Sequence, residues 1–186
     1  MGRFYVGRFS FEGDGSRENS EAYYLVDLAD TNSQSIRLSV EQGNYKRISF
    51  MFGVDSMRSA GGAQTGALDP MKGMFWTWNS GYLTLKMEGQ SVLSNQPGHV
   101  IEYHIGGYRS PYGTSRMINL QLPSDGMAGA ALQTDQKIVV IADLGRLFNG
   151  PNHFTIKDNP SCTTPGEIAG KFATNCASMF SISNEK

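Results

Sequence analysis

Short alternating runs of apolar and polar residues cover most of this chain, and clusters of Gly, Asn, Asp, Ser and Pro separate them. Such alternation is typical of half-buried antiparallel strands, because successive side chains of a strand point to opposite faces. We expect strands at residues 3–12, 21–28, 35–40, 46–54, 74–88, 99–107, 117–122 and 137–144. No repeat or linker divides the sequence, so it predicts one all-β domain over residues 1–186. Its expected fold is an antiparallel β-sandwich with long loops and one short C-terminal helix.

The C-terminal stretch TPGEIAGKFATNCASMF predicts that helix, beginning at about Pro165, with Ile168, Phe172 and Met179 near one face. Two cysteines stand near its ends, Cys162 and Cys176. A helix from Pro165 to Cys176 would rise about 16 Å, whereas a disulfide needs Cα atoms about 4.4–6.8 Å apart. A disulfide would require the preceding segment to fold back. Metal thiolates and free buried thiols are the alternatives.

The charge pattern argues against nucleic acid and against an anionic membrane surface as partners. Lys and Arg total 16 against 17 Asp and Glu, which gives a formal net charge of −1, and no run of five like charges occurs. No apolar run approaches the roughly 20 residues that a transmembrane helix needs. The N-terminus MGRFYVGRFSFEG also lacks the basic and apolar regions of a signal peptide.

Both tryptophans follow a long segment without strand periodicity, residues 55–73. Loops longer than about 12–15 residues are usually functional or disordered, so this segment is the first candidate for a functional site. On a regular strand, Met74, Trp76 and Trp78 share one side. They either pack in the sandwich core or form an electron-rich pocket suited to a soft metal or a redox event.

Three histidines occur in the chain. In HVIEYHIGGY, His104 shares a strand face with Glu102, whereas His99 points to the other side, so these two histidines are not a natural chelating pair. His104 beside Glu102 is either a carboxylate-supported metal ligand or a histidine hydrogen-bonded at a strand end. His153 stands in an expected loop. No hydrolase, zinc-protease, P-loop or dinucleotide-binding motif is present, so we expect no enzyme.

Several blocks together resemble a known family. They are FYVGRFSF (4–11), YYLVD (23–27), ISFMFGVDS (48–56), GAQTGALDPMKGMFWTWNSGYLTLKMEG (62–89), YHIGGY (103–108), ADLGRLFNG (142–150) and TIKDNPSCTTPGEIAGKFATNCASMFSI (155–182). Over essentially the whole chain the sequence resembles the MbnP-like family, the copper-binding proteins associated with methanobactin operons and their relatives in Bacteroidetes. Residues 53–89 are the most specific block, with Leu-Asp-Pro followed by Met-x-Trp-x-Trp-x-x-Gly-Tyr.

The resemblance implies an extracytoplasmic β-sandwich, in the periplasm or on the outer surface of the cell envelope as a lipoprotein. In copper-binding members a tryptophan of this motif can be oxidised to kynurenine by a di-haem peroxidase-like partner, and kynurenine and histidines then hold copper. By position, Trp76 or Trp78 would be the oxidised residue. His104 would match the histidine of the family's His-Leu-Gly motif.

One ligand position differs from the family pattern. Copper-binding members have a histidine in the loop that corresponds to residues 55–73, and this chain has none there. His99 or His153 would have to substitute, or methionines would supply soft ligands for Cu(I). The expected site residues are therefore Trp76, Trp78 and His104, with Met74 and His99, and Met57 and Met71, as further candidate ligands.

Family members also begin with a further strand or hairpin before the Tyr-rich strand. We therefore expect a segment of some tens of residues upstream of Arg3, including the export signal, and an unpaired sheet edge without it.

Two functions remain open at this point. The first is a non-enzymatic copper-binding protein of the cell envelope. The second is an interaction module that binds a glycan or a protein partner through an aromatic face without metal. Exposed, co-planar tryptophans would favour the second, and tryptophans that converge on His104 would favour the first. The sequence does not indicate an oligomeric state.

Overall fold

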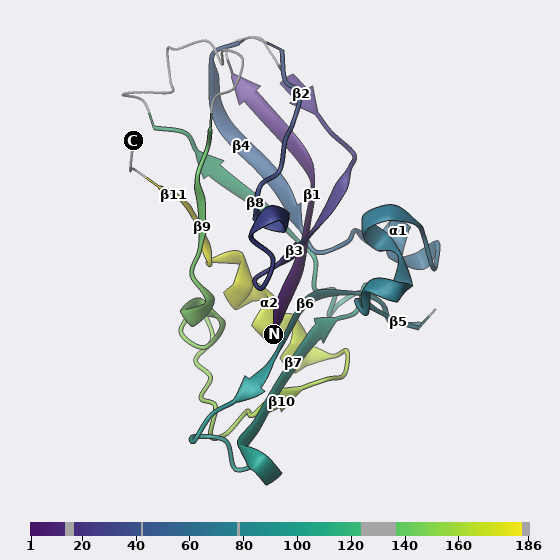
Figure 1. Cartoon of the computed structure of the whole chain (residues 1–186), viewed down its shortest axis with the longest axis vertical. Helices are drawn as coiled ribbons and strands as arrows, with labels where there is room; N and C mark the ends of the chain where they lie inside the picture. Colours follow the sequence, from purple (N-terminus) through teal and green to yellow (C-terminus); the bar gives the residue numbers. More distant parts are fainter. Residues whose placement is uncertain (14–16, 42, 78, 124–136, 184–186) are drawn as a thin grey trace.

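The computed structural model describes residues 1–13, 17–41, 43–77, 79–123 and 137–183, shown as a ribbon in Figure 1. The strands are β1 (Gly2–Gly13), β2 (Arg17–Asn19), β3 (Tyr23–Asp27), β4 (Tyr45–Phe52), β5 (Phe75–Thr77), β6 (Gly81–Gln90), β7 (Val100–Gly106), β8 (Arg116–Gln121), β9 (Val140–Ala142), β10 (Ser161–Cys162) and β11 (Phe180–Ile182). The α-helices are α1 (Ser56–Ala60) and α2 (Glu167–Ala177). Short 3₁₀ helices are η1 (Thr31–Gln34), η2 (Gly66–Leu68), η3 (Pro70–Lys72), η4 (Pro97–His99) and η5 (Leu144–Leu147).

One large curled sheet dominates the described residues, in the order β10-β7-β6-β1-β4-β8, with β2 and β3 beside β1 and β5 beside β6. Strands β9 and β11 form a separate two-stranded sheet. All described ladders are antiparallel except β10 with β7. The predicted β-rich fold with a C-terminal helix is confirmed. The expected sandwich of two antiparallel sheets is replaced by a mixed, curled sheet with a much smaller second one.

Strand β1 is the centre of this sheet. It pairs with β3 and β2 along one side and with β6 and β4 along the other. Phe4, for example, has both Val26 and Leu85 as partners. The expected unpaired edge therefore does not run along β1, because both of its sides are occupied.

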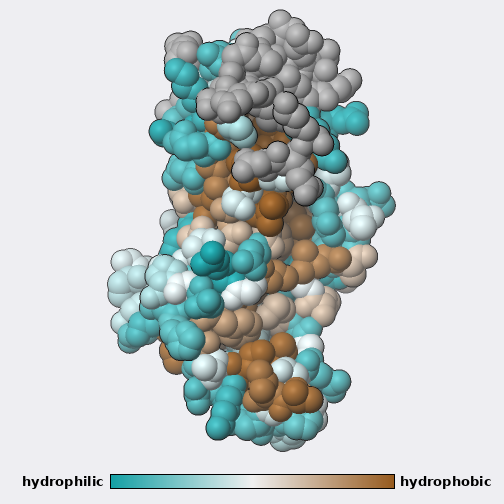
Figure 2. Space-filling model, turned by 90° about the vertical axis from the view of Figure 1, so that its left-hand side faces the viewer, coloured by the Kyte–Doolittle hydropathy of each residue, from teal (hydrophilic) through white to brown (hydrophobic). Residues whose placement is uncertain are grey.

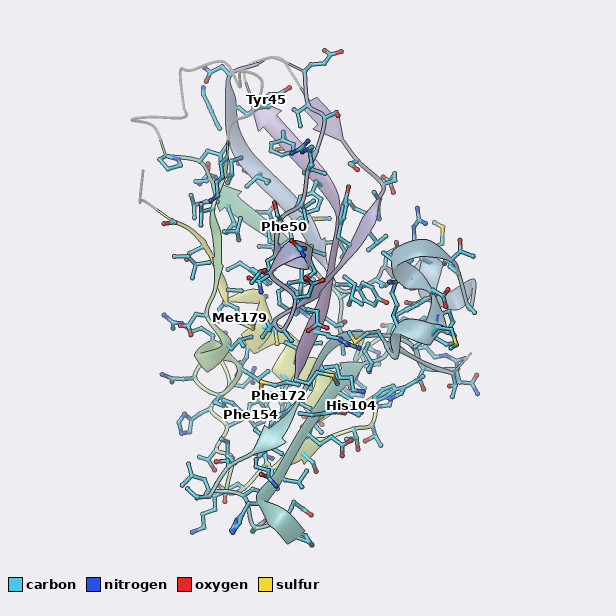
Figure 3. All side chains as sticks on the ribbon, in the orientation of Figure 1. Tyr45, Phe50, His104, Phe154, Phe172 and Met179 are labelled. Atoms are coloured by element: carbon cyan, nitrogen blue, oxygen red, sulfur yellow. The ribbon has the colours of Figure 1, made fainter. Side chains whose placement is uncertain are left out.

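A main hydrophobic cluster fills the space between one face of the large sheet and the layer that helix α2 and the small sheet form. Phe172 of α2 stacks on Phe154, with ring centroids 4.0 Å apart, and meets Tyr103 of β7 edge-on at 5.4 Å. Phe180 of β11 meets Phe50 and Phe52 of β4, each at 5.2 Å. Each buried aromatic side chain contributes roughly 1.5–3 kcal/mol. Figure 3 shows Phe154, Phe172 and Met179 grouped in this layer.

Helix α2 begins two residues later than Pro165, and its buried face differs in part from the expected one. The buried residues follow helical spacing at Ala169, Phe172, Ala173 and Cys176. Ile168 is 51% exposed, so its predicted place on the buried face is wrong, whereas Phe172 and Met179 are buried as expected.

Both cysteines are free and buried. Burial raises the pKa of the Cys162 thiol to about 11 and that of the Cys176 thiol to about 12. Of the three alternatives left by the sequence, the structure contains free buried thiols, which stay protonated at neutral pH and are poor metal ligands in that form.

A second cluster, on the opposite face of the sheet, lies under residues 55–73. Its buried members are Tyr5, Tyr23, Val54, Leu68, Met74, Tyr82 and Leu83. Three tyrosine hydroxyls tie the segment to the sheet. Tyr82 donates to the Leu68 carbonyl at 2.7 Å, Tyr5 to the Ala67 carbonyl at 3.1 Å, and Tyr23 to the Asp55 carboxylate at 2.7 Å. Residues 55–73 are thus ordered and cover the second cluster. They lead directly into β5.

Two further expectations differ from the structure. Residues 35–40 are not a strand; Ile36, Leu38 and Val40 pack against the main cluster without joining a ladder. Residues 74–88 form two strands, because the chain turns at Gly81, which has a φ of 70°. Glycine adopts this left-handed conformation without a Cβ penalty.

The surface beside the small sheet is apolar in part. Figure 2 shows hydrophobic side chains gathered along this side of the molecule. Val140 and Ile141 of β9 are 36% and 47% exposed. None of the described helices is both long enough and apolar enough to cross a bilayer.

Candidate functional site

Strands β6 and β7 carry a row of polar side chains on the sheet face opposite α2. Their antiparallel register pairs Lys86 with His104 and Glu88 with Glu102. Since side chains alternate along a strand, these four project to the same face, and we call them the polar row. The intervening residues, Leu85, Met87, Ile101, Tyr103 and Ile105, belong to or pack against the main cluster. Figure 3 accordingly shows His104 apart from Phe154 and Phe172.

The polar row converges on the Glu88 carboxylate. His104 Nε2 lies 2.7 Å from Glu88 Oε1 and 3.4 Å from Glu102 Oε1. Lys86 Nζ lies 3.2 Å from the same Glu88 oxygen. One ligand atom from each of Glu88, Glu102 and His104 lies within 4.8 Å of the other two, which is close enough for the three residues to share one metal ion.

The electrostatics of the row keep Glu88 ionised. Partial burial raises the pKa of the Glu88 carboxyl, but hydrogen bonds from His104 and Lys86 and their charges outweigh it, so the net pKa is lowered. The His104 side chain is only 13% exposed, whereas that of Glu102 is 43% exposed. The row is thus a half-sheltered site with one open side.

Trp76 lies beside this row. Its ring centroid is 6.4 Å from that of His104, with the planes tilted by 58°. The close approach depends on Gly106, since a Cβ there would stand 3.2 Å from Trp76 Cζ3. Trp76 is half-buried against the second cluster and is not an open platform on an outer face. Trp76 therefore converges with His104, which is the arrangement that favours the metal hypothesis.

The other aromatic and sulfur candidates lie in different surroundings from one another. Trp78 lies outside the described residues. Met74 is fully buried in the second cluster. Met57 and Met71 are 82% and 92% exposed. These three methionines are thus dispersed between core and solvent.

His99 and His153 occupy separate places from His104. His99 is exposed, has a φ of 55° and places Nδ1 3.0 Å from the Ser94 carbonyl oxygen. His104 is five positions further along the chain, a span of roughly 16 Å at 3.3 Å per residue of strand, so the two do not share an ion. His153 is exposed in a turn closed by an isolated bridge to Asn149.

Glu88 is the site residue that sequence reasoning missed. The shared face of His104 and Glu102 follows from strand alternation and is confirmed. Glu88, however, belongs to another strand, and its contact with His104 follows from the β6–β7 register. The sequence signal that could have indicated Glu88 is the presence of an acidic residue in the strand that follows the tryptophans.

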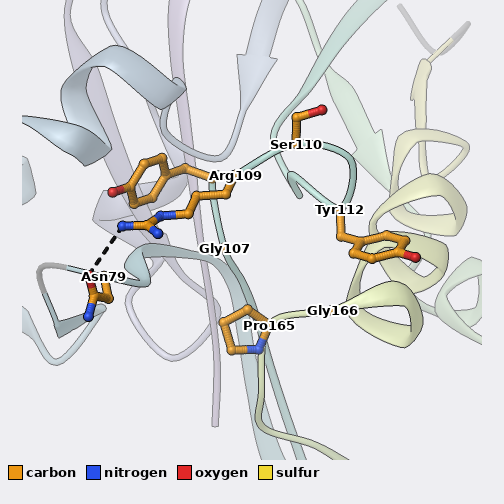
Figure 4. A pocket seen from close by; sticks show the side chains of 8 residues that line it. Asn79, Gly107, Arg109, Ser110, Tyr112, Pro165 and Gly166 are labelled. Atoms are coloured by element: carbon orange, nitrogen blue, oxygen red, sulfur yellow. Dashed lines mark hydrogen bonds between the residues drawn. The ribbon is translucent and has the colours of Figure 1, made fainter.

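A shallow pocket lies away from these residues. Its volume is about 200 Å³, and it is lined by Asn79, Gly107, Tyr108, Arg109, Ser110, Tyr112, Pro165 and Gly166 (Figure 4). Within it, Arg109 donates to the Asn79 side-chain oxygen at 3.2 Å, and its guanidinium lies 5.7 Å from the Tyr108 ring centroid. None of the polar row lines it, so the two sites are separate.

Comparison with known proteins gives a family match. A family model described as MbnP matches residues 2–164. Among solved structures, MbnP from Methylosinus trichosporium matches with a TM-score of 0.48 and 15% sequence identity. That match covers 87% of this chain and 70% of the other. No curated protein sequence matches the chain.

Proposed function

The chain belongs to the MbnP family, which is associated with copper binding, and from this premise we propose that it is a non-enzymatic, extracytoplasmic copper-binding protein. We place the site at the polar row beside Trp76. The carrying observation is the convergence of His104, Glu88 and Glu102, whose ligand atoms lie within 4.8 Å of one another.

The donor set fits copper. Imidazole nitrogen is a common copper ligand, and carboxylate oxygens complete many divalent-metal sites. For a given nitrogen and oxygen site, Cu²⁺ binds more tightly than the other first-row divalent ions. His104 Nε2 and one oxygen each of Glu88 and Glu102 would hold the ion, which would supply a redox-active centre when bound. Adjacent, hydrogen-bonded strands hold the three residues in place, so little conformational freedom is lost on binding.

The tryptophan motif gives the proposal its second part. We assign Trp76 or Trp78 as the residue that a di-haem peroxidase-like partner oxidises to kynurenine. Trp76 has the structural support, because its ring lies 6.4 Å from that of His104. Opening of the indole ring leaves an aryl amine and a ketone, which are additional donor groups near the row.

The proposed location is the periplasm or the outer surface of the cell envelope, where a lipid anchor would hold the protein. The family resemblance supports it.

The test is metal and mass analysis of the protein purified from its native host. We expect bound copper and a mass change on one tryptophan. Copper titration of the recombinant chain adds a residue test: His104→Ala abolishes binding, whereas His153→Ala, which changes an exposed histidine, leaves it unchanged. Native protein without copper, with both tryptophans unmodified, would contradict the proposal and favour the interaction module.

A further inference from the structure

We propose that the pocket between residues 107–115, which join β7 to β8, and the start of α2 is a docking site for a protein partner that presents an acidic side chain to Arg109. The site is distinct from the proposed copper site, since none of the polar row lines the pocket. Three observations carry the proposal: the charge of the lining residues, the way the loop is held, and the exposed apolar side chains around the pocket.

Among the described residues, Arg109 is the only charged one that lines the pocket. Arg3 and Arg47 each pair with a carboxylate, whereas the described structure places no carboxylate against the Arg109 guanidinium. Arg109 instead donates to Asn79 Oδ1 at 3.2 Å and lies 5.7 Å from the Tyr108 ring centroid. These two contacts orient the guanidinium and leave several of its N–H donors for a ligand. Charge complementarity therefore selects an anionic group.

The side chains of the pocket offer more hydrogen-bond donors than acceptors. Asn79 Oδ1 already accepts from Arg109, which leaves the Asn79 amide N–H groups beside the free guanidinium N–H groups. An ionised carboxylate only accepts hydrogen bonds, and its bonds to a guanidinium are strengthened by charge. A neutral sugar would present hydroxyls that also need acceptors. The donor set thus favours a carboxylate over a neutral glycan.

The loop that carries this cation is held in place by hydrogen bonds. The Thr114 N–H and hydroxyl both donate to the Gly107 carbonyl, at 2.9 and 3.1 Å. The Arg116 guanidinium joins the loop to α2, because it donates to the Gly113 carbonyl at 2.6 Å and to the Gly170 carbonyl at 3.1 Å. A loop that is already ordered loses little conformational freedom when a partner binds.

The shape of the pocket limits the size of what it takes. Gly107 allows the loop to approach α2 closely, since a Cβ there would stand 2.9 Å from Pro165 Cβ. Figure 4 shows Arg109 on one side of the pocket and Tyr112 on the other, with Pro165 between them. The volume is about 200 Å³, below the roughly 300–1,000 Å³ of sites that enclose a small molecule. It suits one side chain of a larger partner.

Exposed apolar side chains surround the pocket. Tyr112 is 44% exposed, and Ile168 in the first turn of α2 is 51% exposed; Pro165 is exposed as well. Tyrosine and arginine are enriched among the residues that dominate binding energy at protein interfaces, where apolar neighbours exclude water around them. The nearby Glu167 does not cancel the charge of the pocket, because its Oε1 lies 2.7 Å from Lys171 Nζ. A protein partner would cover this apolar rim.

The pocket also lies next to the tryptophan segment. Asn79 belongs to the turn between β5 and β6, and Gly107 follows Gly106, whose Cβ position is limited by Trp76. A partner anchored at Arg109 would therefore stand beside this segment.

The experiment is an NMR titration of the isotopically labelled, recombinant full chain with two blocked tripeptides, acetyl-Gly-Glu-Gly-amide and acetyl-Gly-Gln-Gly-amide. We expect the glutamate peptide to shift the amide resonances of residues 107–112 and to saturate with a Kd on the order of millimolar, as a single anchor residue would. The glutamine peptide should bind at least about tenfold more weakly, since it lacks the charge. Added salt should weaken binding of the glutamate peptide.

Three variants assign the effect to the guanidinium. Arg109→Gln should weaken binding of the glutamate peptide at least about tenfold. Arg109→Lys should restore only part of the affinity, because an ammonium lacks the planar donor fork. Arg146→Gln removes an exposed arginine of η5 and should bind as the wild type does. Circular dichroism checks that each variant folds.

Four outcomes would overturn the proposal: no shift of residues 107–112 in the wild type, equal binding of the two peptides, unchanged binding in Arg109→Gln, or tighter binding of a methyl glucuronide than of the glutamate peptide. The last would assign the pocket to an acidic glycan. The copper proposal is tested separately, since His104→Ala should leave peptide binding unchanged.

Discussion

His104 Nε2 lies 2.7 Å from Glu88 Oε1, although 16 positions separate the two residues in the chain. The contact spans two neighbouring strands on the face opposite α2. It gives the half-buried histidine a hydrogen-bond partner without a metal. Buried polar groups generally have such a partner. An ion that binds here takes over a site that is already formed, with Trp76 at its side.

Gly106 determines how closely Trp76 approaches the row. A Cβ at this position would stand 2.9 Å from Leu83 Cδ2 and 3.2 Å from Trp76 Cζ3. Gly106→Ala should therefore displace the indole from His104 and destabilise the fold by about 1–3 kcal/mol, as overpacking does. Denaturant unfolding and tryptophan fluorescence measure both effects. Gly89→Ala in β6 is the control, since its Cβ would meet only Ile101 atoms at 3.8 Å or more; equal effects of the two substitutions would contradict the argument.

Tyr82 is expected to hold residues 55–73 in place. Its hydroxyl donates to the Leu68 carbonyl at 2.7 Å and accepts from the Gln64 N–H at 3.0 Å. Tyr82→Phe leaves these groups without their partner, at a cost of about 1–3 kcal/mol. Hydrogen exchange should show faster exchange at Gln64 in the variant. Tyr112→Phe, which changes a side chain of a residue that is 44% exposed, should alter neither quantity, and unchanged exchange in Tyr82→Phe would refute the anchoring role.

The Asp55 carboxyl is expected to make the free energy of unfolding depend on pH. Burial raises the pKa of its carboxyl, but hydrogen bonds from the Arg58 N–H and the Tyr23 hydroxyl and nearby arginine charges outweigh it, so the net pKa is lowered. The folded pKa is thus below the unfolded value of about 3.9. The contribution of Asp55 is fully present above the unfolded value and is lost as the pH falls through the folded value.

The corresponding measurement compares urea unfolding at neutral pH and at about pH 3. The wild type should lose more stability on acidification than Asp55→Asn, because the variant lacks the titrating carboxylate. Glu41→Gln removes an exposed carboxyl and should keep the wild-type dependence. Identical pH profiles for wild type and Asp55→Asn would show that this carboxylate has no such role.

The buried cysteines should resist thiol reagents in the native protein. Cys176 is fully buried with a pKa raised to about 12, and Cys162 is 8% exposed with a pKa raised to about 11. The thiolate is the reactive form, so alkylation should be slow until the chain unfolds. Mass spectrometry should then count two labels in denaturant without reductant. Absence of labelling in denaturant would indicate a disulfide, and rapid native labelling of Cys176 would contradict its burial.

The local alternation of apolar and polar residues was sufficient to predict the strands whose two faces differ in polarity. The alternation in β1, β4, β7 and β8 predicted them, because one side of each strand faces the main cluster and successive side chains alternate. The same alternation placed Glu102 and His104 on one face. The segment 35–40 shows the limit of this reasoning, since its apolar residues bury themselves without a neighbouring strand to pair with.

The sequence by itself determined the family, the β-rich class, the C-terminal helix and the shared face of His104 and Glu102, since these follow from local spacing and from the block around the tryptophans. Only the tertiary structure decided that Glu88 meets His104, that Trp76 reaches the row over Gly106, and that Met74 is in the core. The physical reason is that the register between β6 and β7 and the packing of residues 55–73 depend on contacts between residues far apart in the chain. A one-residue shift of that register would have turned Glu88 to the other face of the sheet.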